Sequence, residues 1–144
     1  MQDRPNAIEL LEAAADFIDR DIVPATEGRR QFQARVAANV MRIVAREIEM
    51  EEPQLNEELR VLADSLGLPA PATRTLKEAR EAALALNQRL SERIRAGEAD
   101  EGPWRERAFQ VMRKLVEEKL KVANPRYLEA DLAARAGEAQ RAGG

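Results

Sequence analysis

The chain has 144 residues, of which 44% are hydrophobic and 34% are charged, and this is the balance of one folded globular domain. It contains no cysteine and no histidine. That composition excludes disulfide frameworks, zinc sites built from thiolate or imidazole, and catalysis by a cysteine or by a serine with a histidine base. The net charge of −3 and the aromatic content of 3% predict that nucleic acid is not a partner. We also expect no metal and no cofactor.

The first residues, MQDRPN, are polar and acidic where a secretory signal needs a basic stretch followed by an apolar one. The longest uncharged stretch, residues 65–73, is short and holds two prolines, so it does not match a membrane-spanning helix. We therefore predict a cytoplasmic protein with no membrane partner.

Hydrophobic periodicity in the first part of the chain predicts three helices. A helix over residues 7–21 opens with the capping-box residues Asn6 and Glu9. A second helix over residues 28–51 carries one apolar stripe, and a third over residues 53–66 begins with a proline and is followed by a glycine. The stripe of the second helix consists of Phe32, Val36, Val40, Ile43 and Met50, with Val44 and Ile48 at its edge.

The second part of the chain predicts two long helices and a short one. Residues 75–97 carry a narrow stripe of partly small apolar residues, and residues 103–124 carry the widest apolar arc of the chain. An Asn-Pro pair ends that helix and starts a short one that reaches about residue 136. Residues 137–144 are expected to form a disordered C-terminal tail.

These elements predict an all-α fold, a bundle of five to six helices in a single domain over residues 1–136. The long helices over residues 28–51, 75–97 and 103–124 are expected to form its core. Because long helices can leave an apolar face uncovered, we expect a homodimer.

A ridge of polar residues borders the apolar stripe of the second helix. Arg35, Asn39, Arg42 and Arg46 are spaced by four, three and four residues and so share one side of the helix. Arginine forks match phosphate and carboxylate groups, so the ridge is a candidate site for an anion or for an acidic helix of a partner. The alternative is pairing with acidic helices of the same chain. We expect Arg46 to pair internally and Arg42 to be exposed.

Two charged residues interrupt the apolar stripes. Glu47 falls between Val40 and Met50, and Lys119 falls between Leu115 and Val122. Buried charges need partners, so Glu47 and Lys119 are candidates for a buried ion pair. The competing interpretation of Glu47 is an acid with a perturbed pKa inside a functional pocket.

Two acidic stretches have a structural and a functional interpretation each. Glu9, Glu12, Asp16 and Asp19 line one side of the first helix, either as a solvated face or as a cation site. Residues 47–58 hold six acids and no Lys or Arg, either as solvated helix termini or as a docking surface for a basic partner. The solvated interpretation is favoured in both cases.

The most recognisable segments of the chain are Arg35-Val36-Ala37-Ala38-Asn39 with Arg46-Glu47, and the closing Asn124-Pro125-Arg126-Tyr127-Leu128. With these segments the chain resembles an uncharacterised bacterial family of short helical proteins. The resemblance spans the chain from Arg4 to about Leu128. It implies a bacterial protein encoded beside aminoglycoside-phosphotransferase-like kinases and acyl-CoA dehydrogenases. It implies no catalytic residues.

The function predicted from the sequence is therefore that of a non-catalytic accessory protein. It would bind a neighbouring phosphotransferase-like kinase or acyl-CoA dehydrogenase through the Arg35–Arg46 ridge or through residues 47–58. The alternative is a small protein that binds a phosphate- or CoA-bearing ligand, or a minor enzyme, with the arginine ridge on the ligand and Glu47 as its acid–base. The chain has no Gly-rich phosphate loop and no kinase catalytic segment, so it is not predicted to be a kinase itself.

Overall fold

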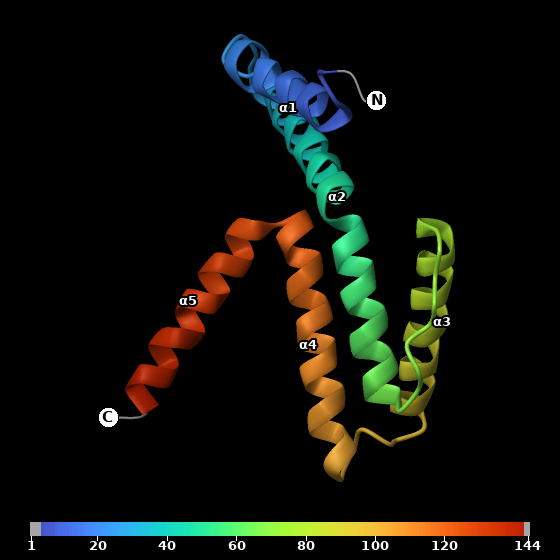
Figure 1. The fold of residues 1–144 in the computed structure, drawn as a ribbon. Coiled ribbons are helices and arrows are strands. Elements are labelled where there is room, and N and C mark those ends of the chain that lie inside the picture. The colour runs from blue at the N-terminus through green and yellow to red at the C-terminus, as the bar shows by residue number, and fades with distance from the viewer. Residues whose placement is uncertain (1–3, 143–144) are drawn as a thin grey trace. The chain divides into compact units, whose positions relative to one another are not determined.

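A computed structural model describes residues 4–142, and these residues form an all-α protein, as the sequence predicts (Figure 1). Over the described residues it has five α-helices and one π-helical turn. In chain order they are α1 (Ala7–Phe17), the π-helical turn η1 (Ile18–Ile22), α2 (Gly28–Leu66), α3 (Leu76–Arg95), α4 (Pro103–Ala123) and α5 (Pro125–Ala142). No helix among the described residues has the length and apolar character needed to cross a membrane.

The predicted capping box starts α1. Asn6 Oδ1 accepts a hydrogen bond from the backbone N–H of Glu9 at 2.9 Å, and the backbone N–H of Asn6 donates to Glu9 Oε2 at 2.8 Å. Thr75 caps α3 in a similar way, because its hydroxyl accepts a hydrogen bond from the backbone N–H of Glu78 at 3.2 Å. These side chains satisfy backbone N–H groups that have no partner within the first helical turn.

Helix α2 continues through Pro53, which corrects the prediction of two helices separated at that residue. Proline lacks the N–H that would donate to the carbonyl four residues earlier, and it favours a break. Here the turn after Pro53 is held by tertiary contacts: Gln54 Nε2 donates to the backbone carbonyl of Glu118 at 2.9 Å, and Leu55 packs against the core. The helix ends where expected, at Gly67, whose φ of 69° lies in the left-handed region that glycine adopts without strain.

The chain divides into two compact units, which we call the N-terminal unit and the C-terminal unit. The first ends at Glu51 and the second begins at Glu52, so α2 contributes to both. The single domain expected over residues 1–136 stays a prediction. Helix α5 runs to Ala142, so residues 137–142 continue the helix where the sequence predicted a disordered tail. Residues 143–144 of that tail lie outside the described residues.

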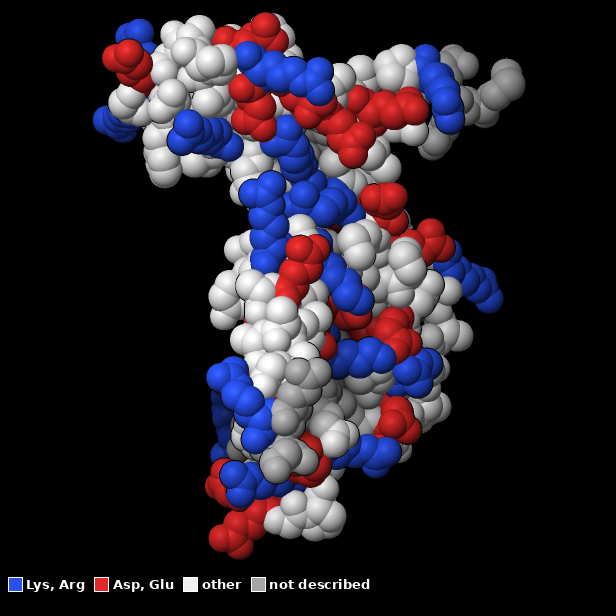
Figure 2. Space-filling model, turned by 90° about the vertical axis from the view of Figure 1, so that its left-hand side faces the viewer, with Lys and Arg blue, Asp and Glu red and all other residues white. Residues whose placement is uncertain are grey.

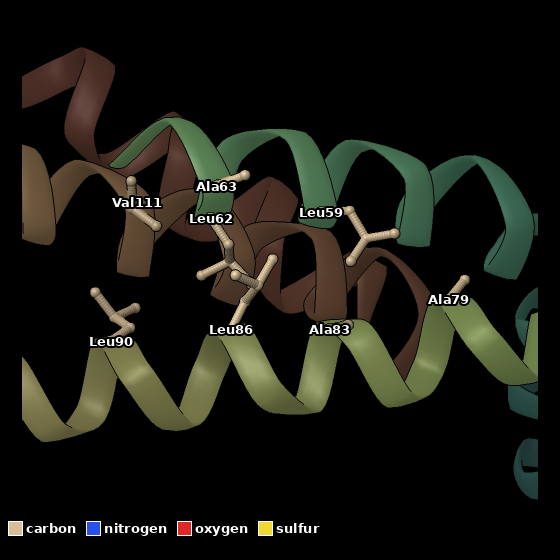
Figure 3. Packing of buried hydrophobic residues seen from close by; sticks show 8 residues of the cluster. All are labelled: Leu59, Leu62, Ala63, Ala79, Ala83, Leu86, Leu90 and Val111. Carbon is tan, nitrogen blue, oxygen red and sulfur yellow. The ribbon is translucent and has the colours of Figure 1, made fainter. Parts of the chain in front are cut away.

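The core of the C-terminal unit is a cluster of leucines and alanines from the second half of α2 and from α3, together with a valine from α4 (Figure 3). Its buried members are Leu59, Leu62, Ala63, Ala79, Ala83, Leu86, Leu90 and Val111. Figure 3 shows Leu62 and Leu86 pointing toward one another from α2 and α3, and Leu62 is 0% exposed. Helices α3 and α4 contribute to the core as predicted. Helix α2 contributes through Leu59, Leu62 and Ala63, not through residues 28–51.

Candidate interaction surface

The N-terminal unit is built on small side chains. Helix α1 lies alongside the first half of α2 (Figure 1), and the buried hydrophobic residues described in this unit are Ala15, Val23, Ala38 and Ala45. Alanine lets two helix backbones approach closely but removes little apolar area from water. This packing therefore positions the two helices with a small apolar core.

Arg42 joins α2 to α1 and to η1 through carboxylates. Its Nη1 donates to Asp19 Oδ2 at 2.6 Å and its Nη2 donates to Asp16 Oδ1 at 3.0 Å, with 34% of the Arg42 side chain exposed. The hydrogen bonds to Asp19 and Asp16 raise the pKa of the Arg42 guanidinium above its ordinary value. Asp16 also accepts a hydrogen bond from Arg20 at 3.1 Å. The expectation that Arg42 is exposed and open to a ligand is therefore wrong, because carboxylates of the same chain occupy its guanidinium.

The other members of the ridge differ from one another in exposure. Arg35 and Asn39 are exposed, and Arg46 is half-buried. An external phosphate at Arg42 would have to displace two carboxylates that already satisfy its donors. The acidic side of α1 is likewise only partly a solvated face, since Asp16 and Asp19 are half-buried and paired.

Glu47 and Lys119 are both exposed, which corrects the expectation of a buried ion pair. Glu47 does fall within an apolar stripe, but that stripe faces solvent. Lys119 lies at the rim of a small hollow of about 40 Å³ between α2 and α4, together with Glu57 and Lys114. Neither charge requires a buried partner, because both side chains are exposed to solvent.

The acid-rich segment over residues 47–58 is partly engaged within the C-terminal unit. Glu57 accepts hydrogen bonds from Arg60, at 2.7 Å, and from Lys114, and these lower the pKa of Glu57 to about 2. Glu58 accepts a hydrogen bond from Asn87 Nδ2 at 2.6 Å. Figure 2 shows acidic and basic side chains close together over the face that it draws. The acids toward the start of the segment, Glu47, Glu49 and Glu52, are exposed.

Most of the apolar stripe predicted on residues 28–51 is exposed, whereas its members Ile43 and Met50 are half-buried. Its largest member, Phe32, is 67% exposed, and Val36, Val40, Val44 and Ile48 are also classed as exposed. At about 100° per residue, Val36 and Val40 lie roughly 170° around the helix from Ala38 and Ala45. Since the two alanines are the buried ones, Val36 and Val40 lie on the opposite side of the helix. Phe32 and Val44 lie about 60° to either side of that direction, and Ile48 lies about 100° from it. We call Phe32, Val36, Val40, Val44 and Ile48 the α2 stripe.

A second exposed apolar surface lies where α4 and α5 meet. It is a groove of about 390 Å³, here called the α4–α5 groove. Its lining residues are Phe109, Met112, Arg113, Val116, Glu117, Leu120, Tyr127, Asp131 and Arg135. Arg135 donates to Glu117 at 3.0 Å, which links α5 to α4 at the rim, and it pairs with Asp131 of its own helix at 2.5 Å.

Sequence reasoning did not find this groove. It assigned the wide apolar arc of residues 103–124 to burial, whereas Phe109 and Val116 are exposed. The feature of the sequence that could have indicated the groove was the width of this apolar arc. An arc covering nearly half a helix needs more than one neighbouring helix to cover it.

The chain belongs to the family described as a domain of unknown function (DUF6285), which matches residues 24–127. The matched range contains the α2 stripe and most of the α4–α5 groove. It excludes Asp16 and Asp19, the two partners of Arg42. No curated protein and no solved structure was found to match the chain.

Proposed function

We propose that this protein is a non-catalytic helical accessory protein that binds a phosphotransferase-like kinase of acyl-CoA metabolism. The observation that supports the proposal is the α4–α5 groove, whose apolar side chains Phe109, Val116 and Tyr127 are exposed. The kinase is proposed from the genomic neighbourhood that the sequence resemblance implies.

The groove has the layout of a surface that holds an amphipathic helix. Apolar side chains of α4 and α5 line it, and Glu117 and Asp131 each pair with Arg135 at its edge. Protein interfaces commonly combine an apolar centre with a polar rim. A partner helix with apolar residues at positions i, i+3 or i+4 and i+7 would place them in such a groove.

The competing function, binding of a phosphate- or CoA-bearing ligand at the arginine ridge, has less support. Arg42 already donates to two carboxylates, and Glu47 is exposed rather than enclosed in a pocket. An exposed carboxylate is a poor candidate for an acid–base tuned by burial.

The proposal is tested by titrating the purified kinase into the purified chain in a calorimeter. We expect binding by the wild-type chain and an affinity at least about 10-fold lower for Val116→Glu, because the substitution puts a charge into the apolar groove. Leu84→Glu is the matched control, since Leu84 is 72% exposed on α3 and lies outside the groove. Unchanged affinity of Val116→Glu, or no binding by the wild-type chain, would contradict the proposal. CoA binding that Arg42→Ala abolishes would favour the competing function.

A further inference from the structure

Helix α2 carries opposite charges in successive parts of its length. Residues 28–46 contain arginines and no Asp or Glu, whereas residues 47–58 contain Asp or Glu and no Lys or Arg. Exposed members of the two sets include Arg29 near the start of the helix and Glu47 farther along it. A second α2 running in the opposite direction would place the basic part of each helix beside the acidic part of the other.

Val36 and Val40, in the middle of the α2 stripe, lie on the same side of the helix as these two charges. Arg29 and Glu47 are separated by a whole number of turns at about 100° per residue, and Val36 is within about 20° of both. One helix face therefore presents an arginine, a run of exposed apolar side chains and then a glutamate. This face lies opposite the alanines that are buried in the N-terminal unit.

The described part of the N-terminal unit buries little apolar surface of its own. Its buried hydrophobic residues are alanines and Val23, whereas Phe32, Val40 and Ile48 are exposed on the α2 stripe. Covering these side chains with another apolar surface would remove them from water, and burial is worth about 25 cal/mol per Å². The stripe is thus a surface that gains from a partner.

We propose that the α2 stripe is a homodimer interface in which two copies of α2 pack antiparallel about a two-fold axis. In the proposed register Phe32 faces Val44 of the partner subunit, and Val36 faces Val40 of the partner subunit. The same register places Arg29 beside Glu47 of the partner subunit. Two-fold symmetry repeats every contact, so the apolar centre has an Arg–Glu pair at each end.

A second copy of the chain fits this face because an antiparallel arrangement puts the apolar side chains of the two helices against one another. It also puts opposite charges side by side. In a parallel pair Arg29 would meet Arg29 of the partner subunit, and Glu47 would meet Glu47 of the partner subunit. Like charges so placed are unfavourable, whereas the antiparallel pair alternates them. The arrangement uses no residue of the α4–α5 groove, so the homodimer and kinase binding stand or fall separately.

The test is light scattering on the full chain over a range of concentrations. We expect a mass of about twice 16.1 kDa at high micromolar concentration. Val40→Asp should shift the protein to the monomer, since it places a charge at the centre of the apolar contact, while circular dichroism shows that helix content is kept. Val116→Glu in the α4–α5 groove and Leu84→Glu on α3 are controls that should remain dimeric. A wild-type monomer, or a Val40→Asp variant as dimeric as the wild type, would overturn the proposal.

Charge exchange tests the direction of the helices. Arg29→Glu alone should raise the dimer dissociation constant by about 10-fold or more at low salt, because it would face Glu47 of the partner subunit. Arg29→Glu combined with Glu47→Arg should restore most of the affinity. A double variant no tighter than the single one would exclude the proposed register.

Spin labels give a readout that does not depend on affinity. The chain has no cysteine, so Arg30→Cys and Ala37→Cys each introduce one labelling site. In the antiparallel pair two labels at position 30 lie about 24 Å apart along the helix axis, and two at position 37 lie about 3 Å apart. Equal distances at the two positions would indicate a parallel pair and overturn the proposal.

Discussion

The two units bury different kinds of side chain, although both are made of amphipathic helices. The C-terminal unit encloses Leu59, Leu62, Leu86 and Leu90 between three helices. The N-terminal unit encloses mainly alanines and leaves Phe32 and its neighbours on the α2 stripe exposed. An apolar stripe shows that a helix has a face to cover. It does not show which surface covers it, because that depends on how many helices surround it.

The largest loss of stability is predicted for a truncated side chain in the core of the C-terminal unit. Leu62→Ala should lower the free energy of unfolding by about 2–5 kcal/mol, because Leu62 is 0% exposed and its neighbours cannot fully close the cavity. Urea denaturation followed by circular dichroism measures the loss. A loss below about 1 kcal/mol would mean that this cluster is not the core.

In the N-terminal unit, where alanines are buried, added side-chain volume should lower the stability. Ala38→Leu should lower the free energy of unfolding by about 1–3 kcal/mol, because Ala38 is 0% exposed and the inserted side chain must push its surroundings apart. Ala37→Leu, at an exposed position on the same helix, is the control. Equal stability of the two variants in urea melts would contradict close packing at Ala38.

Part of the fold could be predicted from the sequence. The all-α class, the capping box at Asn6 and the end of α2 at Gly67 depend on residues close together in the chain, and the structure has them where predicted. The path of α2 through Pro53 depends on contacts with α4, which no local pattern contains.

The candidate site was harder to predict for the same reason. The periodicity predicts a ridge that includes Arg42, but it does not contain its partners Asp16 and Asp19, which come from α1 and η1. Glu47 is exposed, and periodicity alone does not show which side of a helix is covered. The buried residues of this part of α2 are Ala38 and Ala45, which lie about 160–180° from Glu47.

The ion pairs of Arg42 should contribute a moderate amount to the N-terminal unit. Arg42→Ala should lower the free energy of unfolding by about 1 kcal/mol, because the partly exposed guanidinium bridges two carboxylates and solvent screens part of the attraction. Arg35→Ala should change it by less than about 0.5 kcal/mol, as for an exposed position. Urea denaturation of the two variants side by side measures both changes in the free energy of unfolding. Losses of equal size would show that the ion pairs of Arg42 contribute no more than an exposed side chain does.

Acid titration should show a smaller effect in the C-terminal unit. The pKa of Glu57 is lowered from 4.5 to about 2 by Arg60 and Lys114, so this carboxylate stabilises the fold above pH 4.5 and loses that contribution as the pH falls toward 2. Glu57→Gln should flatten the fall in stability over this interval by about 0.5 kcal/mol, a value reduced for solvent screening. Stability measured from pH 6 to pH 2 checks it, with Glu12→Gln as a control at an exposed position. An unchanged slope in Glu57→Gln would show that the pairing contributes nothing.

The contrast between an enclosed core and an uncovered stripe is tested most directly by denaturing Leu62→Ala and Val40→Ala side by side in urea. Both substitutions remove aliphatic carbon, but Leu62 is 0% exposed and Val40 is 49% exposed. At protein concentrations low enough to keep the chain monomeric, Leu62→Ala should cost about 2 kcal/mol or more and Val40→Ala less than about 0.5 kcal/mol. Losses of equal size at the two positions in the monomer would contradict the assignment of the α2 stripe to the surface.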